Sequence, residues 1–160
     1  MKSELILFDK DLVKKIIVIP QPPPIWLENV KNKREENRGG DFLKLFYPAG
    51  DYPHKNHVFL SELNKADLSD LPVEELILTL KKNPCPNISW IKCVGIQNHE
   101  NIKNFYKSFD CMLFLSNTES YGLPLIESIF SGIPIICPDL PYARAICRNK
   151  ARYYIPNDIQ

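Results

Sequence analysis

From about residue 41 onward, short apolar runs alternate with segments in which apolar side chains recur every three or four positions. The first pattern predicts strands and the second predicts helices. Several of the runs are apolar on both faces, as in a parallel sheet that helices cover on both sides. The fold class is therefore α/β, Rossmann-like, with a mostly parallel sheet. The predicted strands are 42–48, 75–80, 89–94, 111–115, 133–137 and 152–155, and the predicted helices are 56–66, 100–109, 122–130 and 142–147.

The first 40 residues have a different pattern. A short helix is expected over 3–15 and a buried strand over 16–19, and the proline-rich run 20–24 then forces an extended backbone typical of a hinge or linker. Residues 31–40 are charged, contain no apolar side chain and end in two glycines, which predicts an exposed loop. We expect the compact domain to be residues 41–160.

Composition narrows the possible functions. A chain of 160 residues with 44% hydrophobic content can bury the core of one domain. Twenty basic and 19 acidic side chains give a net charge of +1, which excludes a broad basic surface for nucleic acid. Five cysteines without Cys-x-x-Cys spacing indicate reduced thiols and a cytoplasmic protein, no apolar run is long enough for a transmembrane segment, and the histidine spacing predicts no metal site.

The segment 111–136 is the most informative part of the chain. An apolar strand leads through a polar turn with Glu119 into a helix that begins near Gly122 and carries Glu127. Free backbone N–H groups and the helix dipole make such a helix start an anion site that suits a nucleotide diphosphate. Alternatively, Glu119 or Ser120 caps the helix and no ligand is involved. The chain has neither Gly-x-Gly-x-x-Gly nor a P-loop, so phosphate must be held in another way.

This segment resembles the signature of retaining GT-B-fold glycosyltransferases of the family 4 type (glycosyl transferases group 1). The matching positions are Ser116, Glu119, Tyr121, Gly122, Leu123, Pro124, Glu127, Gly132 and Pro134. The resemblance assigns Glu127 to the ribose hydroxyls and places Glu119 beside the donor sugar as a catalytic residue. It also implies that Tyr121 and the backbone around Gly122, Leu123 and Leu125 contact the sugar or the diphosphate.

A second block, residues 45–57, also resembles this family. Lys55 stands where a family lysine contacts the donor phosphates, and it would act both in donor binding and in catalysis by offsetting the charge of the leaving diphosphate. The family more often has an arginine five residues earlier, where this chain has Gly50. His54 and Arg144 are the open candidates to replace that arginine. The resemblance also places the loop with His99 near the base or the sugar.

The resemblance implies one half of a two-domain GT-B enzyme of polysaccharide biosynthesis. Residues 1–40 would be the end of a preceding domain and the interdomain linker, and residues 41–160 a donor domain truncated at its C-terminus. We expect this hexosyltransferase fragment to bind a UDP- or GDP-sugar without another cofactor and to lack activity alone, because the N-terminal acceptor-binding domain is missing. The full enzyme would retain configuration and glycosylate a glycan or lipid-linked acceptor, in the cytoplasm or at the inner face of a membrane. The alternative is a free-standing nucleotide-binding or regulatory module.

Overall fold

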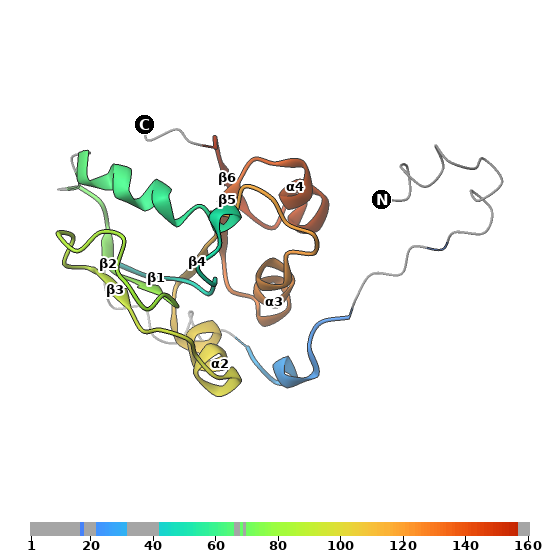
Figure 1. The fold of residues 1–160 in the computed structure, drawn as a ribbon. Coiled ribbons are helices and arrows are strands. Elements are labelled where there is room, and N and C mark those ends of the chain that lie inside the picture. The colour runs from blue at the N-terminus through green and yellow to red at the C-terminus, as the bar shows by residue number, and fades with distance from the viewer. Residues whose placement is uncertain (1–16, 18–21, 32–41, 66–67, 69, 157–160) are drawn as a thin grey trace.

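The computed structural model describes residues 17, 22–31, 42–65, 68 and 70–156. Six strands form one parallel sheet in the order β3-β2-β1-β4-β5-β6 (Figure 1). The sheet grows in one direction from β1 to β3 and in the other from β4 to β6, so its topological switch point lies between β1 and β4. This confirms the predicted Rossmann-like parallel sheet. The strands are β1 (Leu43–Tyr47), β2 (Val73–Leu78), β3 (Ile91–Cys93), β4 (Cys111–Leu113), β5 (Ile135–Pro138) and β6 (Arg152–Tyr154).

All four helices predicted within residues 41–160 are present at the predicted positions. One of them, η5, is a 3-10 helix, and the hydroxyl of Ser61 bonds to the carbonyl of Val58 three residues earlier in this tighter winding. Two further 3-10 turns, η2 and η4, lie where the sequence predicted no helix. The helical elements are η2 (Ile25–Leu27), η4 (Pro53–Lys55), η5 (His57–Lys65), α2 (His99–Ser108), α3 (Leu123–Ser131) and α4 (Pro141–Cys147).

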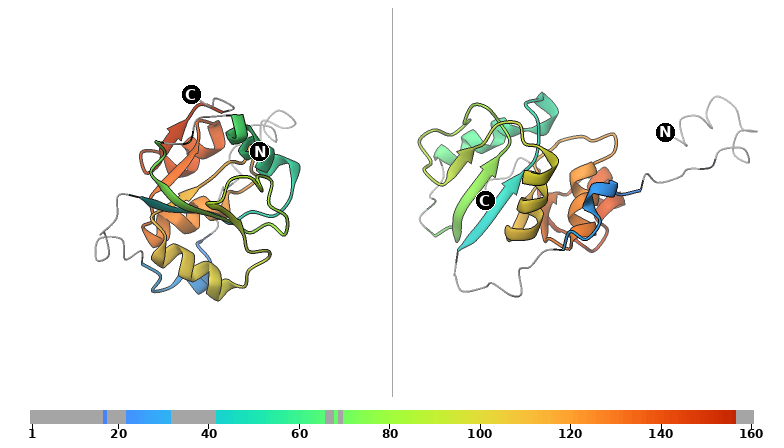
Figure 2. Two further views of the ribbon diagram at one scale, coloured as in Figure 1. Left: turned by 90° about the vertical axis from the view of Figure 1, so that its left-hand side faces the viewer. Right: turned by 90° about the horizontal axis from the view of Figure 1, so that it is seen from below.

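Consecutive side chains of β1 point to opposite faces of the sheet and meet different helices. Tyr47 packs against His57 of η5, with 5.0 Å between ring centroids. The Phe46 ring packs on the other face against two rings of α2 and the ring that follows its last residue. Helices therefore cover both faces, as Figures 1 and 2 show for η5 and α2. The partners of Phe46 are Phe105 and Tyr106 of α2 and Phe109 directly after it, at centroid distances of 5.8, 5.1 and 5.7 Å.

Glycines set both ends of α3. Gly122 before its first turn has φ 68° and Gly132 after its last turn has φ 79°, a left-handed backbone that side chains disfavour. The N–H of Gly132 donates to the carbonyl of Ser128 over 3.0 Å and closes the helix. The position and direction of α3, which carries Glu127, are thus fixed at both ends.

Part of the segment predicted as a linker packs on the domain. Leu27 and Val30 belong to the buried core, and η2 contacts α3, which it adjoins in Figure 1. Pro24 has the extended backbone that the proline run predicted, with φ −58° and ψ 137°. The predicted helix 3–15, the strand 16–19 apart from Ile17, and the loop 31–40 apart from Lys31 lie outside the described residues.

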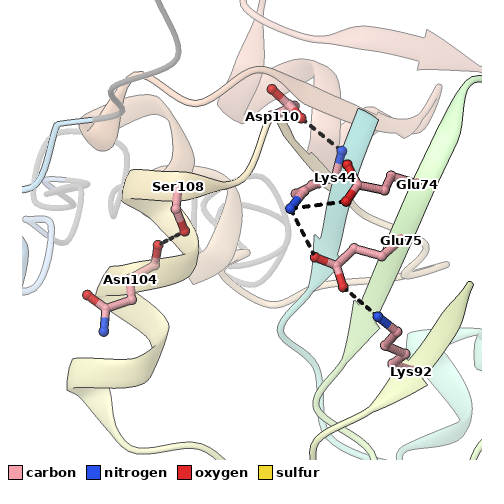
Figure 3. Close-up of polar contacts among 7 residues, drawn as sticks. All are labelled: Lys44, Glu74, Glu75, Lys92, Asn104, Ser108 and Asp110. Atoms are coloured by element: carbon pink, nitrogen blue, oxygen red, sulfur yellow. Dashed lines mark hydrogen bonds and ion pairs between the residues drawn. The ribbon is translucent and has the colours of Figure 1, made fainter. Parts of the chain in front are cut away.

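The amino ends of the strands carry an ion-pair network that is remote from the switch point (Figure 3). Lys44 on β1 pairs with Glu74 and Glu75 of β2 at 3.2 and 3.9 Å. Its backbone N–H donates to Asp110 over 2.8 Å, and the N–H of Asp110 donates to the Lys44 carbonyl over 2.9 Å. These reciprocal bonds hold the start of β4 against β1.

Two further expectations concern the compartment of the protein. All five cysteines are free, and each is buried or half-buried, as the sequence predicted for interior thiols. No helix in the part of the chain that the structure describes is long and apolar enough to cross a membrane.

Candidate functional site

Lys55 and Glu119 lie side by side at the switch point. Lys55 ends η4 in the loop after β1, and Glu119 lies in the loop after β4. Lys55 Nζ is 2.6 Å from Glu119 Oε1, and the two side chains are only 15% and 9% exposed. Because ligands of such folds bind outside the carboxyl ends of the strands at the switch point, this pair occupies the expected position for a ligand site.

A buried hydroxyl network ties Lys55 to the end of β4. The Tyr47 hydroxyl donates to the Lys55 carbonyl over 2.9 Å and lies 2.9 Å from Ser116 Oγ. A phenol has one proton, so Ser116 is the donor to Tyr47. The Tyr142 hydroxyl donates to the Ser116 carbonyl. Burial raises the pKa of both tyrosines far above the ordinary value, so they remain neutral donors.

The two loops are also bonded to each other directly. The N–H of Asn117 donates to the His54 carbonyl over 2.8 Å, and Asn56 Nδ2 donates to Asn117 Oδ1 over 3.2 Å. Asn56 has φ 55°, a left-handed conformation that asparagine tolerates better than most residues. Together these bonds fix the Lys55 loop on the Glu119 loop.

Neither Glu119 nor Ser120 caps the start of α3, so the capping alternative is wrong. The residue before the helix is Gly122, no side chain caps it, and Glu119 pairs with Lys55. The N–H of Leu125 donates to the Gly122 carbonyl over 3.0 Å, and the Leu125 side chain is fully buried in the core. Leu125 therefore supports the turn, and its N–H is already used within it.

Glu127 is buried inside the second turn of α3. Its side chain accepts a 2.7 Å hydrogen bond from the Tyr106 hydroxyl of α2, and the residue is 9% exposed. Desolvation raises the pKa of Glu127 above its ordinary value, while the Tyr106 bond and nearby His99 oppose this shift. A carboxyl group in this setting is held in one orientation and can accept hydrogen bonds from a ligand's hydroxyl groups.

Glu127 lines a cavity of about 470 Å³ across the carboxyl ends of β1 and β2. Trp26 of η2 forms part of its wall and stacks on His99, with 5.2 Å between ring centroids and 7° between planes. The volume is within the range typical of small-molecule sites. Further lining residues are Pro24, Pro48, Ala49, Gly50, Thr79, Ile96, Gln97, Ile102, Leu123 and Pro124.

A second cavity, of about 840 Å³, lies between α3 and α4. Glu119 and Tyr121 line it together. The structure thus distributes the predicted residues over the two sides of the α3 start, with Leu123 and Glu127 on the first cavity and Glu119 and Tyr121 on the second.

The side chain of Tyr52 lies over Gly50, the position where the family resemblance would place an arginine. A Cβ atom at position 50 would lie 3.0 Å from the Tyr52 ring. Of the two proposed replacements, His54 stacks on Tyr52 at 5.8 Å. Arg144 binds Asp139 through two bonds of 2.6 and 2.7 Å. Arg144 is thus engaged at the exposed surface of α4.

Three side chains that line or support the site were not identified from the sequence. Trp26 lies in a segment that was assigned to a linker, and Tyr47 reads as one more apolar position of a buried strand. Tyr106 follows the apolar spacing of α2, which predicts core packing but not a hydroxyl aimed at Glu127.

In the described part of the chain, no three His, Cys, Asp or Glu side chains are grouped to hold a metal.

The model of the family described as glycosyl transferases group 1 matches residues 86–159, which include β3 to β6, Glu119 and Glu127. The match covers 74 of the 160 residues, so this segment is similar to glycosyl transferases of group 1. The Lys55 loop precedes the matched segment.

Curated relatives of this segment are named as glycosyltransferases. A UDP-N-acetylglucosamine–peptide N-acetylglucosaminyltransferase GtfA subunit from Streptococcus agalactiae is 35% identical over 88 residues, which cover 54% of this chain and 16% of that protein. The serotype-specific mannosyltransferase WbdA from Escherichia coli is 29% identical over 92 residues, which cover 54% of this chain and 11% of that protein. The matched segments therefore span a small part of these relatives.

Solved GT-B glycosyltransferases share the fold. A sucrose-phosphate synthase from Thermosynechococcus elongatus has a TM-score of 0.64 at 18% identity, over 98% of this chain and 44% of that one. The pneumococcal O-GlcNAc transferase GtfA, in complex with UDP and GlcNAc, has a TM-score of 0.59 at 18% identity, over 99% and 33%. The C-terminal domain of a group 1 family protein (LpcC) from Francisella tularensis has a TM-score of 0.53 at 14% identity, over 81% and 79%.

Proposed function

We propose that this chain is the donor-binding domain of a retaining hexosyltransferase and holds a nucleotide sugar across the switch point. The observation that carries this proposal is the meeting of Lys55 and Glu119 at the carboxyl ends of β1 and β4, together with Glu127 on a cavity across the carboxyl ends of β1 and β2. The basic side chain and the helix start suit the phosphates, Glu119 suits the sugar, and Glu127 suits the ribose of one ligand.

In this proposal the nucleoside occupies the cavity lined by Glu127. The carboxylate accepts hydrogen bonds from two ribose hydroxyls, as a two-oxygen acceptor does well. The base lies toward His99 and Gln97, where Trp26 closes one wall by stacking on His99. Both UDP and GDP remain candidates. UDP is favoured by its presence in the structure of the pneumococcal GtfA, whereas the mannosyltransferase relatives leave GDP open.

Lys55 and the helix start hold the diphosphate. The Lys55 cation offsets charge on the leaving diphosphate, and the backbone at Gly122 and Leu123 faces the same space at the N-terminus of α3. Glu119 and Tyr121 then contact the sugar from the side of the second cavity. Because glycine at position 50 has no charged side chain, Lys55 is the one cation that we assign to the phosphates.

Catalysis needs an acceptor beside the donor. We propose that a second, acceptor-binding domain provides it, and that these 160 residues alone bind donor without transferring sugar to a glycan or lipid-linked acceptor at an ordinary rate. Transfer gains much of its rate when both reactants are held in register. The alternative of a nucleotide-binding module without catalysis is favoured by Gly50, because that position carries no cation for the leaving group.

A thermal-shift panel of nucleoside diphosphates and nucleotide sugars tests the proposal. A ligand at 100 times its dissociation constant stabilises by about 2.7 kcal/mol, which raises the Tm of a domain of this size by about 5 to 10 °C. We expect such a shift for one base, with UDP as the first candidate. No shift with any UDP or GDP ligand at millimolar concentration would contradict the proposal.

A further inference from the structure

We infer that Glu119 makes the site select the sugar-loaded donor over the spent nucleoside diphosphate. In the structure its carboxylate binds Lys55. When a donor binds, its phosphates pair with Lys55 and its sugar hydroxyls donate hydrogen bonds to Glu119 in place of Lys55. A diphosphate without sugar pairs with Lys55 but offers Glu119 no replacement partner. This inference rests on the proposed function.

The pair is enclosed enough for its disruption to matter. The side chains of Lys55 and Glu119 are 15% and 9% exposed, and their atoms are 2.6 Å apart. A mostly buried charge that loses its partner keeps its desolvation penalty without the compensating attraction. A ligand that removes Lys55 from Glu119 must therefore supply another partner for the carboxylate or bind less tightly.

Glu119 lies on a loop whose backbone is held in place when a phosphate arrives. Its loop is bonded to the Lys55 loop through Asn117 and the carbonyl of His54, and through the Tyr47–Ser116 hydroxyl pair. Phosphates that bind Lys55 in this frame lie next to a carboxylate of the same charge sign. The like-charge contact weakens binding of the diphosphate, whose terminal phosphate carries its full charge.

The sugar relieves both problems. Esterification of the terminal phosphate lowers its charge, and the hydroxyl groups of the sugar can donate to the two oxygens of Glu119. Because Glu119 also lines the cavity of about 840 Å³ between α3 and α4, a sugar has space on that side of the carboxylate. The same carboxylate thus favours the substrate and disfavours the product.

A simple structural salt bridge would behave differently. Removing Glu119 would then leave Lys55 without its partner and would alter the affinities for product and donor to the same extent. Under the selection account, Glu119→Gln frees the cation and tightens the binding of the diphosphate specifically.

The experiment is calorimetry of the 160-residue chain and its variants with UDP, GDP, UDP-N-acetylglucosamine and GDP-mannose. We expect Glu119→Gln to lower the Kd of the bound diphosphate about tenfold and to leave the Kd of the matching nucleotide sugar unchanged or higher. Glu74→Gln, which removes an equal charge from an ion pair with Lys44 at the amino end of the sheet, should leave every Kd unchanged. Lys55→Met combined with Glu119→Gln should abolish the gain.

The outcomes separate this inference from the proposed function. If the wild-type chain binds a nucleotide and Glu119→Gln binds the diphosphate equally or more weakly, Glu119 does not select against product, and the donor site stands. If neither the wild-type chain nor Glu119→Gln binds any of the four ligands, the proposed function and this inference are both wrong.

Discussion

The hydroxyl of Tyr106 donates a 2.7 Å hydrogen bond to Glu127, and both residues are buried. One comes from α2 and the other from α3, so the bond joins two helices at the cavity proposed for the nucleoside. The acceptor that we assign to the ribose is therefore oriented before a ligand arrives.

Replacing Glu127 should separate its role in binding from its role in folding. Glu127→Gln keeps an oxygen for Tyr106 but loses the charge, and we expect nucleotide affinity to fall about 10- to 150-fold, equivalent to about 1.5 to 3 kcal/mol. Glu127→Ala should lose as much affinity and also destabilise the domain by about 1 to 3 kcal/mol, because the Tyr106 hydroxyl then lacks its partner. Calorimetry and urea unfolding check the two effects. An unaltered Kd in both variants would remove Glu127 from the site.

The raised pKa of Glu127 has a defined effect on stability. A carboxyl that binds its proton more tightly in the folded state makes the fold less stable as pH rises from its unfolded pKa, about 4.3, through its folded pKa. We expect Glu127→Gln to lose this part of the pH dependence and to be at least as stable as the wild-type chain at pH 7. Urea unfolding of both proteins between pH 4 and 8 measures the difference. If the unfolding free energy of Glu127→Gln falls with rising pH in parallel with that of the wild-type chain, another group is responsible for the pH dependence.

Tyr106→Phe should change the pH profile of binding. The variant removes the hydrogen bond that favours the charged carboxylate, so the pKa of Glu127 should rise further. Nucleotide affinity should therefore begin to fall at a higher pH than in the wild-type chain when the solution is acidified. His99 lies near Glu127 in both proteins, so the difference between their profiles reports the Tyr106 bond. Superimposable Kd-against-pH curves would assign Tyr106 to core packing alone.

The tight start of α3 should be sensitive to added atoms. Gly122→Ala places a Cβ atom 2.7 Å from the Ile146 side chain and forces alanine to φ 68°, so we expect a loss of about 1 to 3 kcal/mol in unfolding free energy. Gly132→Ala is the matched control, because it has a similar φ of 79° but no atom within 4 Å of the new Cβ. Its loss should be smaller, about 1 kcal/mol. Equal losses in thermal unfolding would show that the Ile146 contact relaxes freely.

The sequence predicted the sheet better than the site because the local apolar pattern of a segment is enough to predict a strand. The continuous apolar runs of β4 and β5 mark buried parallel strands, and the glycines at 122 and 132 mark the ends of a helix. The pairing of Lys55 with Glu119 joins residues 64 positions apart and depends on the strand order 2-1-4. No local pattern contains that information, and the family resemblance assigned the two residues to separate parts of the ligand.

Trp26 shows a second limit of local patterns. The proline run before it predicts extended chain, as found at Pro24, but whether this chain packs on a domain depends on the surface it meets. Here Trp26 stacks on His99, and Leu27 enters the core. The residues contributed by this segment to the cavity wall could be found only from the tertiary structure.

The central claim is that a donor nucleotide binds at the carboxyl ends of β1 and β4. Backbone NMR of the labelled 160-residue chain, titrated with the nucleotide that gives the largest thermal shift, tests it most directly. The account predicts that the amide signals of Gly50, Lys55, Glu119, Gly122 and Glu127 shift together and saturate with one Kd. Shifts confined to the cavity at the amino end of β5, around Gly132 and Asn149, or no saturable shifts at all, would contradict it.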